Sequence, residues 1–175
     1  MRRPIRVAVV TVSDGVASGN RADRGGPACE KALADSGVAY EVVSRETVAD
    51  ERAQIARIVR ARADSGAVDV VVLTGGTGLS PRDRTPEAVR QVIDFEAPGL
   101  AEKMRAETGR DFAAAYLSRQ VAGVRGRALV LALPGSPKGA ADCLRAVAEL
   151  LPHAVELVRG EKLDHPRPDP EIEGA

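Results

Sequence analysis

Three continuous apolar runs constrain the possible fold more than any other feature of this sequence. They are rich in β-branched residues and cover residues 5–13, 68–74 and 128–134. Strands that are apolar on both faces must be covered on both faces, which is typical of a parallel sheet between two layers of helices. A fourth, more polar segment at residues 39–45 predicts a strand nearer the edge of the sheet.

Helix signals alternate with these runs. Prolines precede or open several apolar-periodic segments, and glycines follow several of them, which is the usual asymmetry of helix ends. The predicted helices cover residues 27–35, 51–63, 86–93, 100–108, 137–150 and 152–158. The alternation predicts an α/β fold: a three-layer, doubly wound, mostly parallel sheet with helices on both faces. Glycine turns at residues 116–128 predict a small antiparallel addition.

Length and composition fit one domain with a real hydrophobic core. The chain has 175 residues, of which 44% are hydrophobic, and only 2% are aromatic. The core is therefore expected to consist of Val, Leu, Ile and Ala. We predict one α/β domain over residues 1–160 and a mobile, Pro-rich and charged tail over residues 161–175.

Charge and residue usage exclude several classes of protein. The 25 basic and 25 acidic residues cancel, which argues against a nucleic-acid or membrane surface. The basic start is followed by a run too short for a membrane span, so we expect a cytoplasmic protein. Cys29 and Cys143 lack metal-ligand spacing and are predicted to be small buried residues. His153 and His165 lie near no cysteine or nucleophilic serine, which disfavours a zinc site or a catalytic triad.

Ligands of parallel α/β sheets bind at the carboxyl ends of the strands, so the segments after the runs hold the candidate site residues. Ser13 and Asp14 open a long polar loop, and loops of this length are often functional. Asp23, near the end of that loop, is compatible with an exposed turn. Asp50 follows the second strand, and taken alone it is best explained as a helix cap.

The apolar run at residues 68–74, the third predicted strand, leads into the sequence LTGGTGLSPRDRTPEA at residues 73–88. This glycine-rich stretch matches neither a P-loop nor a dinucleotide-binding fingerprint. Consecutive glycines nevertheless allow backbone N–H groups to approach a phosphate, and Ser-Pro and Thr-Pro pairs predict two helix starts. The candidate phosphate-binding residues here are Gly75, Gly76, Thr77, Gly78, Ser80 and Arg82.

Asp83 is the unexpected member of this stretch. A carboxylate beside an anion site is repulsive unless a cation lies between them, and Mg²⁺ favours carboxylate and phosphate oxygens. The alternative is a turn residue held by Arg82 or Arg84. Spacing alone supports both interpretations equally.

The apolar run at residues 128–134, the last strong predicted strand, leads into a further turn and a helix start. Pro134, Gly135 and Ser136 form the turn, and Lys138 lies in the first turn of the predicted helix. A lysine there opposes the helix dipole unless an anion lies nearby, although a surface lysine is the ordinary alternative.

Five segments in order carry a resemblance to a known family. They are TVSD, ADRGGP, VLTGGTGLSPRDRTPEA, SRQVAGVRGRALVLALPGSPKG and LPHAVELVRG. Together they resemble the molybdopterin adenylyltransferases, which share the molybdenum-cofactor-biosynthesis fold with gephyrin, and the resemblance covers nearly all of residues 5–160. The R-D-x-T-P pattern at residues 82–86 is similar to the adenylyltransferases, whereas a related branch of small cofactor-binding proteins often departs from it.

The resemblance implies an activity and a set of roles. Family members use ATP and Mg²⁺ to adenylylate the terminal phosphate of molybdopterin, with release of pyrophosphate. It implies that Asp50 and Asp83 are the two aspartates needed for the chemistry, and both are candidate Mg²⁺ ligands. It also implies that residues 75–78 and 134–138 bind substrate, that the protein is a homotrimer, and that its product passes to a metal-inserting enzyme.

Two alternatives remain beside this interpretation. A non-catalytic molybdopterin-binding or scaffold member could keep the glycine loops without the aspartates, so Asp50 and Asp83 argue against it. An unrelated nucleotide-binding α/β protein is disfavoured by the failed P-loop and dinucleotide-binding matches.

Overall fold

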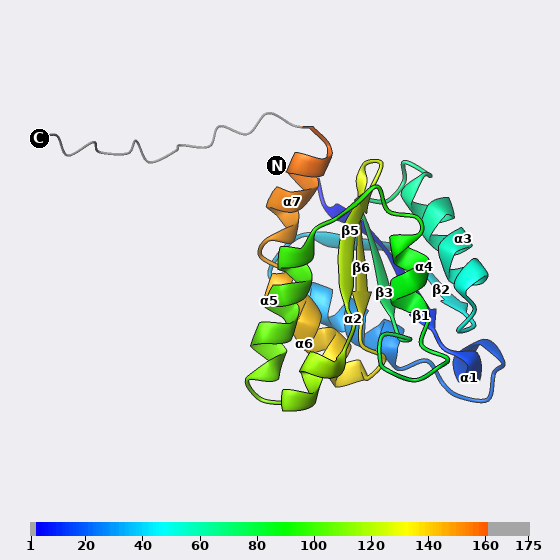
Figure 1. Cartoon of the computed structure of the whole chain (residues 1–175). Helices are drawn as coiled ribbons and strands as arrows, with labels where there is room; N and C mark the ends of the chain where they lie inside the picture. The colour runs from blue at the N-terminus through cyan, green and yellow to red at the C-terminus, as the bar shows by residue number, and fades with distance from the viewer. Residues whose placement is uncertain (1–2, 161–175) are drawn as a thin grey trace, which may run out of the picture.

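The computed structural model describes residues 3–160, which form a six-stranded sheet with helices on both faces (Figure 1). The strand order is β2-β1-β3-β6-β5-β4. Four strands are parallel to one another, and β5 and β4 complete the sheet through antiparallel pairing. The strands are β1 (Ile5–Val12), β2 (Tyr40–Val48), β3 (Val70–Thr74), β4 (Phe95–Glu96), β5 (Val121–Arg125) and β6 (Ala128–Leu133). The predicted α/β, mostly parallel sheet is confirmed.

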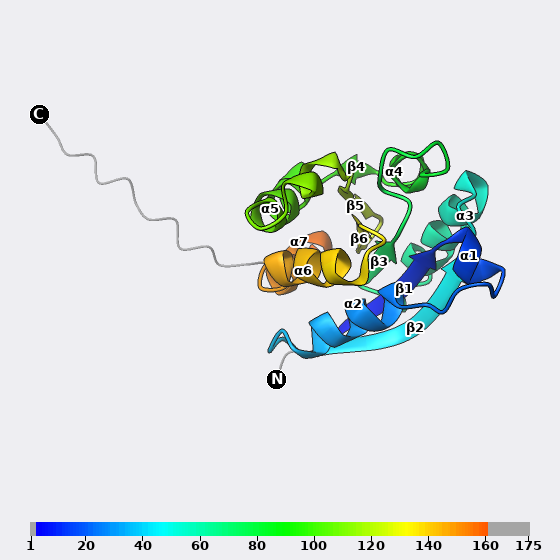
Figure 2. The same ribbon diagram turned by 90° about the horizontal axis from the view of Figure 1, so that it is seen from below.

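The helices form two layers, as Figure 2 shows from below. One layer packs on the sheet through α2 (Gly25–Ala34), α5 (Pro98–Gly109), α6 (Pro137–Val147) and α7 (Leu151–Val158). The other packs on the opposite face through α3 (Arg52–Ala63) and α4 (Thr85–Arg90). Two short elements, α1 (Asp14–Ala17) and the 3₁₀ helix η1 (Ala113–Leu117), lie in connections.

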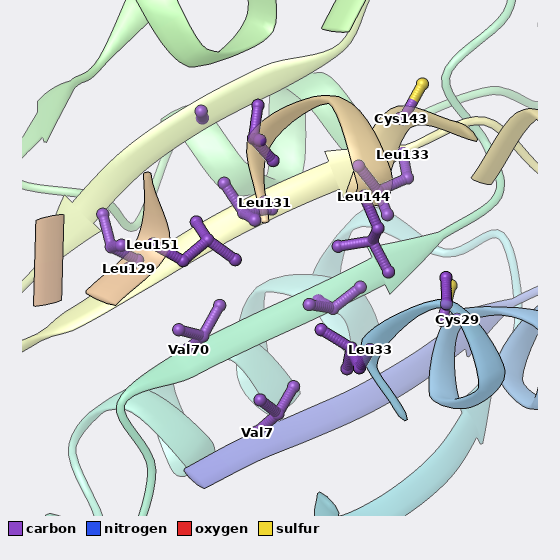
Figure 3. Packing of buried hydrophobic residues seen from close by; sticks show 14 of the residues in the cluster. Val7, Cys29, Leu33, Val70, Leu129, Leu131, Leu133, Cys143, Leu144 and Leu151 are labelled. Atoms are coloured by element: carbon purple, nitrogen blue, oxygen red, sulfur yellow. The ribbon is translucent and has the colours of Figure 1, made fainter. Parts of the chain in front are cut away.

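The strand sequences divide their side chains between the two layers. Val7 and Val9 of β1 lie in the cluster under the first layer, whereas Val10 of the same strand lies in the cluster under the second. Figure 3 shows the first cluster, in which Leu33 of α2 and Leu144 of α6 pack over the central strands. All eight residues of β1 are apolar or threonine except one arginine because both faces of this strand are covered.

The two cysteines lie in the same cluster, as predicted. Cys29 and Cys143 are buried and are not joined by a disulfide. Burial raises the pKa of the Cys29 thiol to about 12 and that of the Cys143 thiol to about 11. Both therefore remain neutral packing groups near neutral pH, because the reactive form of cysteine is the thiolate.

The structure corrects several predicted boundaries. The helix predicted at 27–35 begins at Gly25, because a proline fits anywhere in the first turn, where N–H groups have no partner within the helix. The edge strand β2 continues to Val48, three residues beyond the prediction. Ser80 and Pro81 start no helix and lie in a turn instead. The tail predicted at 161–175 lies outside the described residues, and the domain boundary at residue 160 stays a prediction.

No helix in residues 3–160 is both long and apolar enough to cross a membrane.

The amino ends of the parallel strands meet at one buried carboxylate. Asp69 directly precedes β3, and its side chain is 3% exposed. It accepts the backbone N–H of Arg6 at 2.9 Å and pairs with the guanidinium groups of Arg6 at 3.1 Å and Arg159 at 2.8 Å. Burial alone would raise the pKa of Asp69, but the hydrogen bonds from Arg6 and Arg159 lower it to about 2. This carboxylate therefore joins the ends of β1, β3 and α7.

We expect Asp69→Asn to lower the free energy of unfolding by roughly 2 kcal/mol at pH 7. The folded-state pKa lies below the unfolded value, so this stabilisation is complete above about pH 4 and is lost as the pH falls through about 2. Urea unfolding of both proteins between pH 7 and pH 2 should show their difference shrinking in that window. Asp35→Asn, which removes the exposed Lys31–Asp35 pair, is the control and should change stability by less than about 0.5 kcal/mol. A difference between Asp69→Asn and wild type that is independent of pH would contradict the assignment.

Candidate active site

A hollow of about 720 Å³ lies at the carboxyl ends of β1 and β3. This end of the sheet lies near α1 in Figure 1. The loops after β1, β2, β3 and β6 all contribute to its wall. The lining residues are Thr11, Val12, Ser13, Val16, Arg21, Ala22, Asp23, Arg24, Gly25, Asp50, Thr74, Gly75, Gly76, Asp83, Gly135, Ser136 and Pro137.

The glycine loop after β3 packs directly against the end of β1. Gly75 has a φ of 114°, and a Cβ at this position would collide with the carbonyl oxygen of Val12. Thr85 holds the loop from the other side, because its hydroxyl donates to the Gly75 carbonyl at 2.8 Å and its backbone N–H donates to the Gly76 carbonyl at 3.1 Å. Only glycine satisfies both the dihedral angle and the close approach at position 75.

The same loop makes room for two carboxylates. A Cβ at Gly76 would lie 3.0 Å from Asp50 Oδ1, and a Cβ at Gly78 would lie 2.8 Å from Asp83 Oδ2. Both distances are shorter than ordinary carbon–oxygen contacts. The absence of side chains at Gly76 and Gly78 thus lets two carboxylates approach the same stretch of backbone, Asp50 from the loop after β2 and Asp83 from further along the glycine loop.

Asp50 is bound to the loop after β1 and does not cap α3. Its Oδ2 accepts the backbone N–H of Asp14 at 2.8 Å, and its own N–H donates to Asp14 Oδ1 at 3.0 Å. Glu51 occupies the N-cap position of α3, so the interpretation of Asp50 as a cap is wrong. Burial raises the pKa of Asp50, and the negative charges of Asp14 and Asp83 act in the same direction, against the lowering effect of the Asp14 N–H group.

Asp83 lies in the turn that ends the glycine loop. Its Oδ2 accepts the backbone N–H of Ser80 at 2.9 Å, so part of the turn interpretation is correct. Arg82 does not hold it, because the Arg82 guanidinium pairs with Asp14 and Glu51. Asp83 instead lines the hollow that Asp50 also lines.

Positive charge and helix starts lie on the same hollow as the carboxylates. The first residue of α2, Gly25, and the N-cap residue of α6, Ser136, both border it. Helix N-termini carry a partial positive charge and bind anions, and Arg21 and Arg24 add two full charges to the wall. The hollow therefore combines two helix N-termini and two arginines with the carboxylates of Asp23, Asp50 and Asp83.

Comparisons with known proteins agree with this arrangement. A family described as a probable molybdopterin binding domain matches residues 8–153. The chain belongs to this family.

Named members of the family cover most of the chain. A molybdopterin adenylyltransferase of Helicobacter pylori (strain J99) is 38% identical over 156 residues, which are 89% of each protein. That of Escherichia coli (strain K12) is 33% identical over 168 residues, 89% of this chain and 86% of the relative. The crystal structure of the molybdopterin biosynthesis enzyme MoaB from Thermus thermophilus is 51% identical, with a TM-score of 0.83, covering 89% of this chain and 97% of that one. The predicted resemblance is confirmed.

The carboxylates of this family member fit a divalent cation that is shared with a substrate. The described residues hold no group of three or more His, Cys, Asp or Glu side chains arranged around one metal position. Asp50 and Asp83 alone supply two oxygen donors, and Mg²⁺ in proteins is commonly bound by one or two carboxylates together with substrate phosphates and water. Burial is the main cause of the raised pKa of Asp50, and the negative charges of Asp14 and Asp83, which a cation would offset, raise it further.

The structure brings together about half of the predicted site residues. The hollow is lined by Ser13, Asp50, Gly75, Gly76, Asp83, Gly135 and Ser136. Asp14 lies directly behind Asp50. Four predicted residues belong to the glycine loop but do not line the hollow; they are Thr77, Gly78, Ser80 and Arg82.

Two details of the glycine loop differ from the prediction. The N–H of Gly75 donates to the Leu133 carbonyl at 3.1 Å, so this amide is engaged in joining β3 to β6 and does not face a phosphate. Thr77 is buried, and its hydroxyl lies 2.9 Å from that of Ser118. Arg119 then binds the carbonyl oxygens of Gly78 and Asp83 at 2.8 and 2.9 Å. Residues 118–119 thus support the loop from outside the hollow.

Pro134 and Lys138 line a second hollow, of about 1100 Å³, between α5, η1 and α6. Ser136 borders both hollows, so they meet at the turn after β6. Lys138 is 85% exposed and pairs with Asp142 one turn along α6 at 2.5 Å. Asp142 offsets the unfavourable position of this lysine, which supports the interpretation of Lys138 as a surface residue.

Sequence reasoning missed Asp23 as a structural member of the site. Its Oδ2 accepts the hydroxyl of Thr11 at 2.9 Å, and its Oδ1 accepts the N–H of Gly26 at 3.0 Å. It therefore fixes the start of α2 against the end of β1 and is not merely an exposed turn residue. An aspartate placed three residues before the second of two glycines is a capping signal that could have indicated this role.

We expect Gly75→Ala to destabilise the protein by about 2–4 kcal/mol, because alanine can adopt neither the dihedral angle nor the close approach to Val12. Urea unfolding provides the measurement. Gly99→Ala is the matched control: no atom lies within 4 Å of its added Cβ, and the residue is inside α5, so its stability should be unchanged or slightly higher. Equal effects of the two substitutions would contradict the packing of the loop on β1.

Proposed function

We propose that this protein transfers AMP from ATP to the terminal phosphate of molybdopterin, giving adenylyl-molybdopterin and pyrophosphate, in molybdenum cofactor biosynthesis. The observation that carries this proposal is the convergence of Asp50 and Asp83 on a glycine loop, in a hollow that two helix starts also border. Membership of the family and relatives named molybdopterin adenylyltransferase support it.

The reaction requires neither a covalent enzyme intermediate nor a general base. An oxygen of the molybdopterin phosphate attacks the α-phosphorus of ATP, and the bond between that phosphorus and the bridging oxygen of the β-phosphate breaks. Pyrophosphate leaves with the bonding electron pair. The nucleophile is already an anion, so no general base is needed, and positioning and charge stabilisation account for the rate.

Different residues of the hollow would bind the phosphates and the metal ion. Arg21 and Arg24, together with the start of α2, would bind phosphate oxygens. Asp50 and Asp83 would hold Mg²⁺, which neutralises charge on the phosphates when it is bound. Neither carboxylate needs to move a proton in this scheme.

A second candidate function is a non-catalytic molybdopterin-binding or scaffold protein. Such a protein would need the glycine loop but would have no use for two like charges packed against it. Burial raises the pKa of Asp50 and the charges of Asp14 and Asp83 add to the shift, and an unfavourable placement of this kind favours the enzyme.

We expect Asp50→Asn and Asp83→Asn each to reduce the formation of adenylylated product by about 100-fold or more, because each removes one of two charged metal ligands. The assay incubates purified protein with molybdopterin, ATP and Mg²⁺ and measures the adenylylated product and pyrophosphate. Asp35→Asn, on the exposed end of α2, is the matched control and should keep wild-type activity.

Two outcomes of this assay distinguish a wrong activity from a wrong role for Asp83. If the wild-type protein forms no product, the enzyme proposal is wrong. If wild type is active and Asp83→Asn keeps full activity, only the role given to Asp83 is wrong.

We further propose a cytoplasmic homotrimer whose product passes to a metal-inserting enzyme, as the family resemblance implies. Phe112, Tyr116 and Leu117 lie around η1 with 67%, 61% and 58% of their surface exposed. Neighbouring exposed apolar side chains of this size often mark a contact between proteins.

Light scattering of the purified protein should give about three times the chain mass of 18.4 kDa. Replacing Leu117 by Ser should weaken the assembly if this segment lies in the contact. A monomer at micromolar concentration would contradict the trimer.

A further inference from the structure

Arg82 connects three of the loops that build the active site. Its Nε and one terminal nitrogen donate to the carboxylate oxygens of Asp14, at 2.8 to 3.1 Å, and its other terminal nitrogen donates to Glu51 at 3.0 Å. Asp14 follows β1, Glu51 follows β2, and Arg82 itself follows β3. We call these three side chains the Arg82 clasp.

The clasp continues to the first proposed catalytic carboxylate. Asp14 and Asp50 exchange two hydrogen bonds, in which each backbone N–H donates to the carboxylate of the other residue, at 2.8 and 3.0 Å. Two carboxylates this close repel each other unless one of them is neutralised. The bidentate contact from Arg82 supplies this neutralisation on Asp14 and leaves Asp50 to line the hollow.

The clasp also reaches the second proposed catalytic carboxylate, through the chain itself. Asp83 is the next residue after Arg82, in the turn whose geometry is fixed by the Ser80 N–H group. Hydrogen bonds therefore connect Asp50 to Asp14 and Asp14 to Arg82, which is the neighbour of Asp83 in the chain. A change at Arg82 would therefore alter the separation of the Asp50 and Asp83 carboxylates.

The contacts of Arg82 agree less well with direct phosphate binding than with a role in binding Asp14 and Glu51. Arg82 does not line the hollow, whereas Arg21 and Arg24 do. Its guanidinium donates four hydrogen bonds to Asp14 and Glu51, and both of these partners are acidic. A substrate phosphate would have to displace these carboxylates in order to reach it.

We propose that Arg82 is a positioning residue: it binds Asp14 so that Asp14 holds Asp50 at the correct distance from Asp83. The inference rests on the proposed adenylyl transfer, in which those two carboxylates hold Mg²⁺ beside the phosphates. The geometry of the guanidinium is essential, because one ammonium group cannot reproduce a bidentate contact with Asp14 and a further contact with Glu51.

The clasp can be tested in the free protein, without substrate. Amide hydrogen exchange of residues 14 and 50 reports the two hydrogen bonds between Asp14 and Asp50. Arg82→Gln should raise exchange at both amides by about tenfold or more while leaving the strands protected. Arg90→Gln removes a similar exposed pair, Arg90 with Glu96 at 2.7 Å, and should leave both amides unchanged.

A double-mutant cycle on the reaction distinguishes positioning from substrate binding. Arg82→Gln and Asp14→Ala should each lower kcat by about 10- to 100-fold and change KM for ATP by less than about threefold. The double variant should be no slower than the slower single variant, because both substitutions break the same path. Arg82→Lys should behave like Arg82→Gln, whereas Arg90→Gln should match wild type.

Several results would overturn the proposal. Multiplicative losses in the double variant, a rise in KM for ATP at unchanged kcat, or full activity of Arg82→Lys would each contradict positioning through a bidentate contact with Asp14. Unchanged amide exchange in Arg82→Gln would show that it does not hold Asp14 and Asp50. If wild type forms no adenylylated product, the proposed function fails, but the exchange measurement still decides whether the clasp exists.

Discussion

The close approach of Gly75 to the carbonyl oxygen of Val12 is the constraint on which the rest of the active site depends. It brings the exit of β3 into contact with the end of β1, its parallel neighbour in the sheet. The loop then turns back so that Thr85 can donate a hydrogen bond to Gly75. Gly76 and Gly78 have no side chains, so Asp50 and Asp83 can lie close to their backbone. A larger residue at position 75 would separate the two strand ends, and the two carboxylates would no longer share one hollow.

Charge is distributed very differently at the two ends of the sheet. At the amino ends, Asp69 is surrounded by arginines, so burial of this carboxylate is fully offset and its pKa falls to about 2. At the carboxyl ends, Asp14 and Asp50 lie against each other, Asp83 adds a third negative charge, and burial raises the pKa of Asp50. The first arrangement stabilises the fold, whereas the second leaves negative charge that a bound cation would offset.

The fold could be predicted because its signals are local and repeated. Continuous apolar strands, alternating with helices that end at glycine or proline, predict a layered α/β sheet without knowledge of contacts between distant residues. The similarity to the MoaB structure supports the same fold. The roles of Asp50 and Asp23 could not be read in the same way. Asp50 exchanges hydrogen bonds with Asp14, 36 residues away, so a local pattern suggested a cap for α3 instead. The resemblance to a family, and not spacing, indicated its importance.

Arg82 shows how the contacts of a residue in a recognised motif can favour another role than the one that the motif predicts. An arginine beside a glycine loop is a reasonable phosphate ligand when only the sequence is known, because guanidinium groups bind phosphates and carboxylates with the same geometry. The fold decides between these partners, since the loop after β1 delivers the carboxylate of Asp14 to Arg82 while Arg21 and Arg24 line the hollow. An active site with three nearby aspartates needs a cation of its own to keep them together before substrate arrives. Arg82 pairs with Asp14 in this position, which favours the proposal that Arg21 and Arg24 of the long loop bind phosphate.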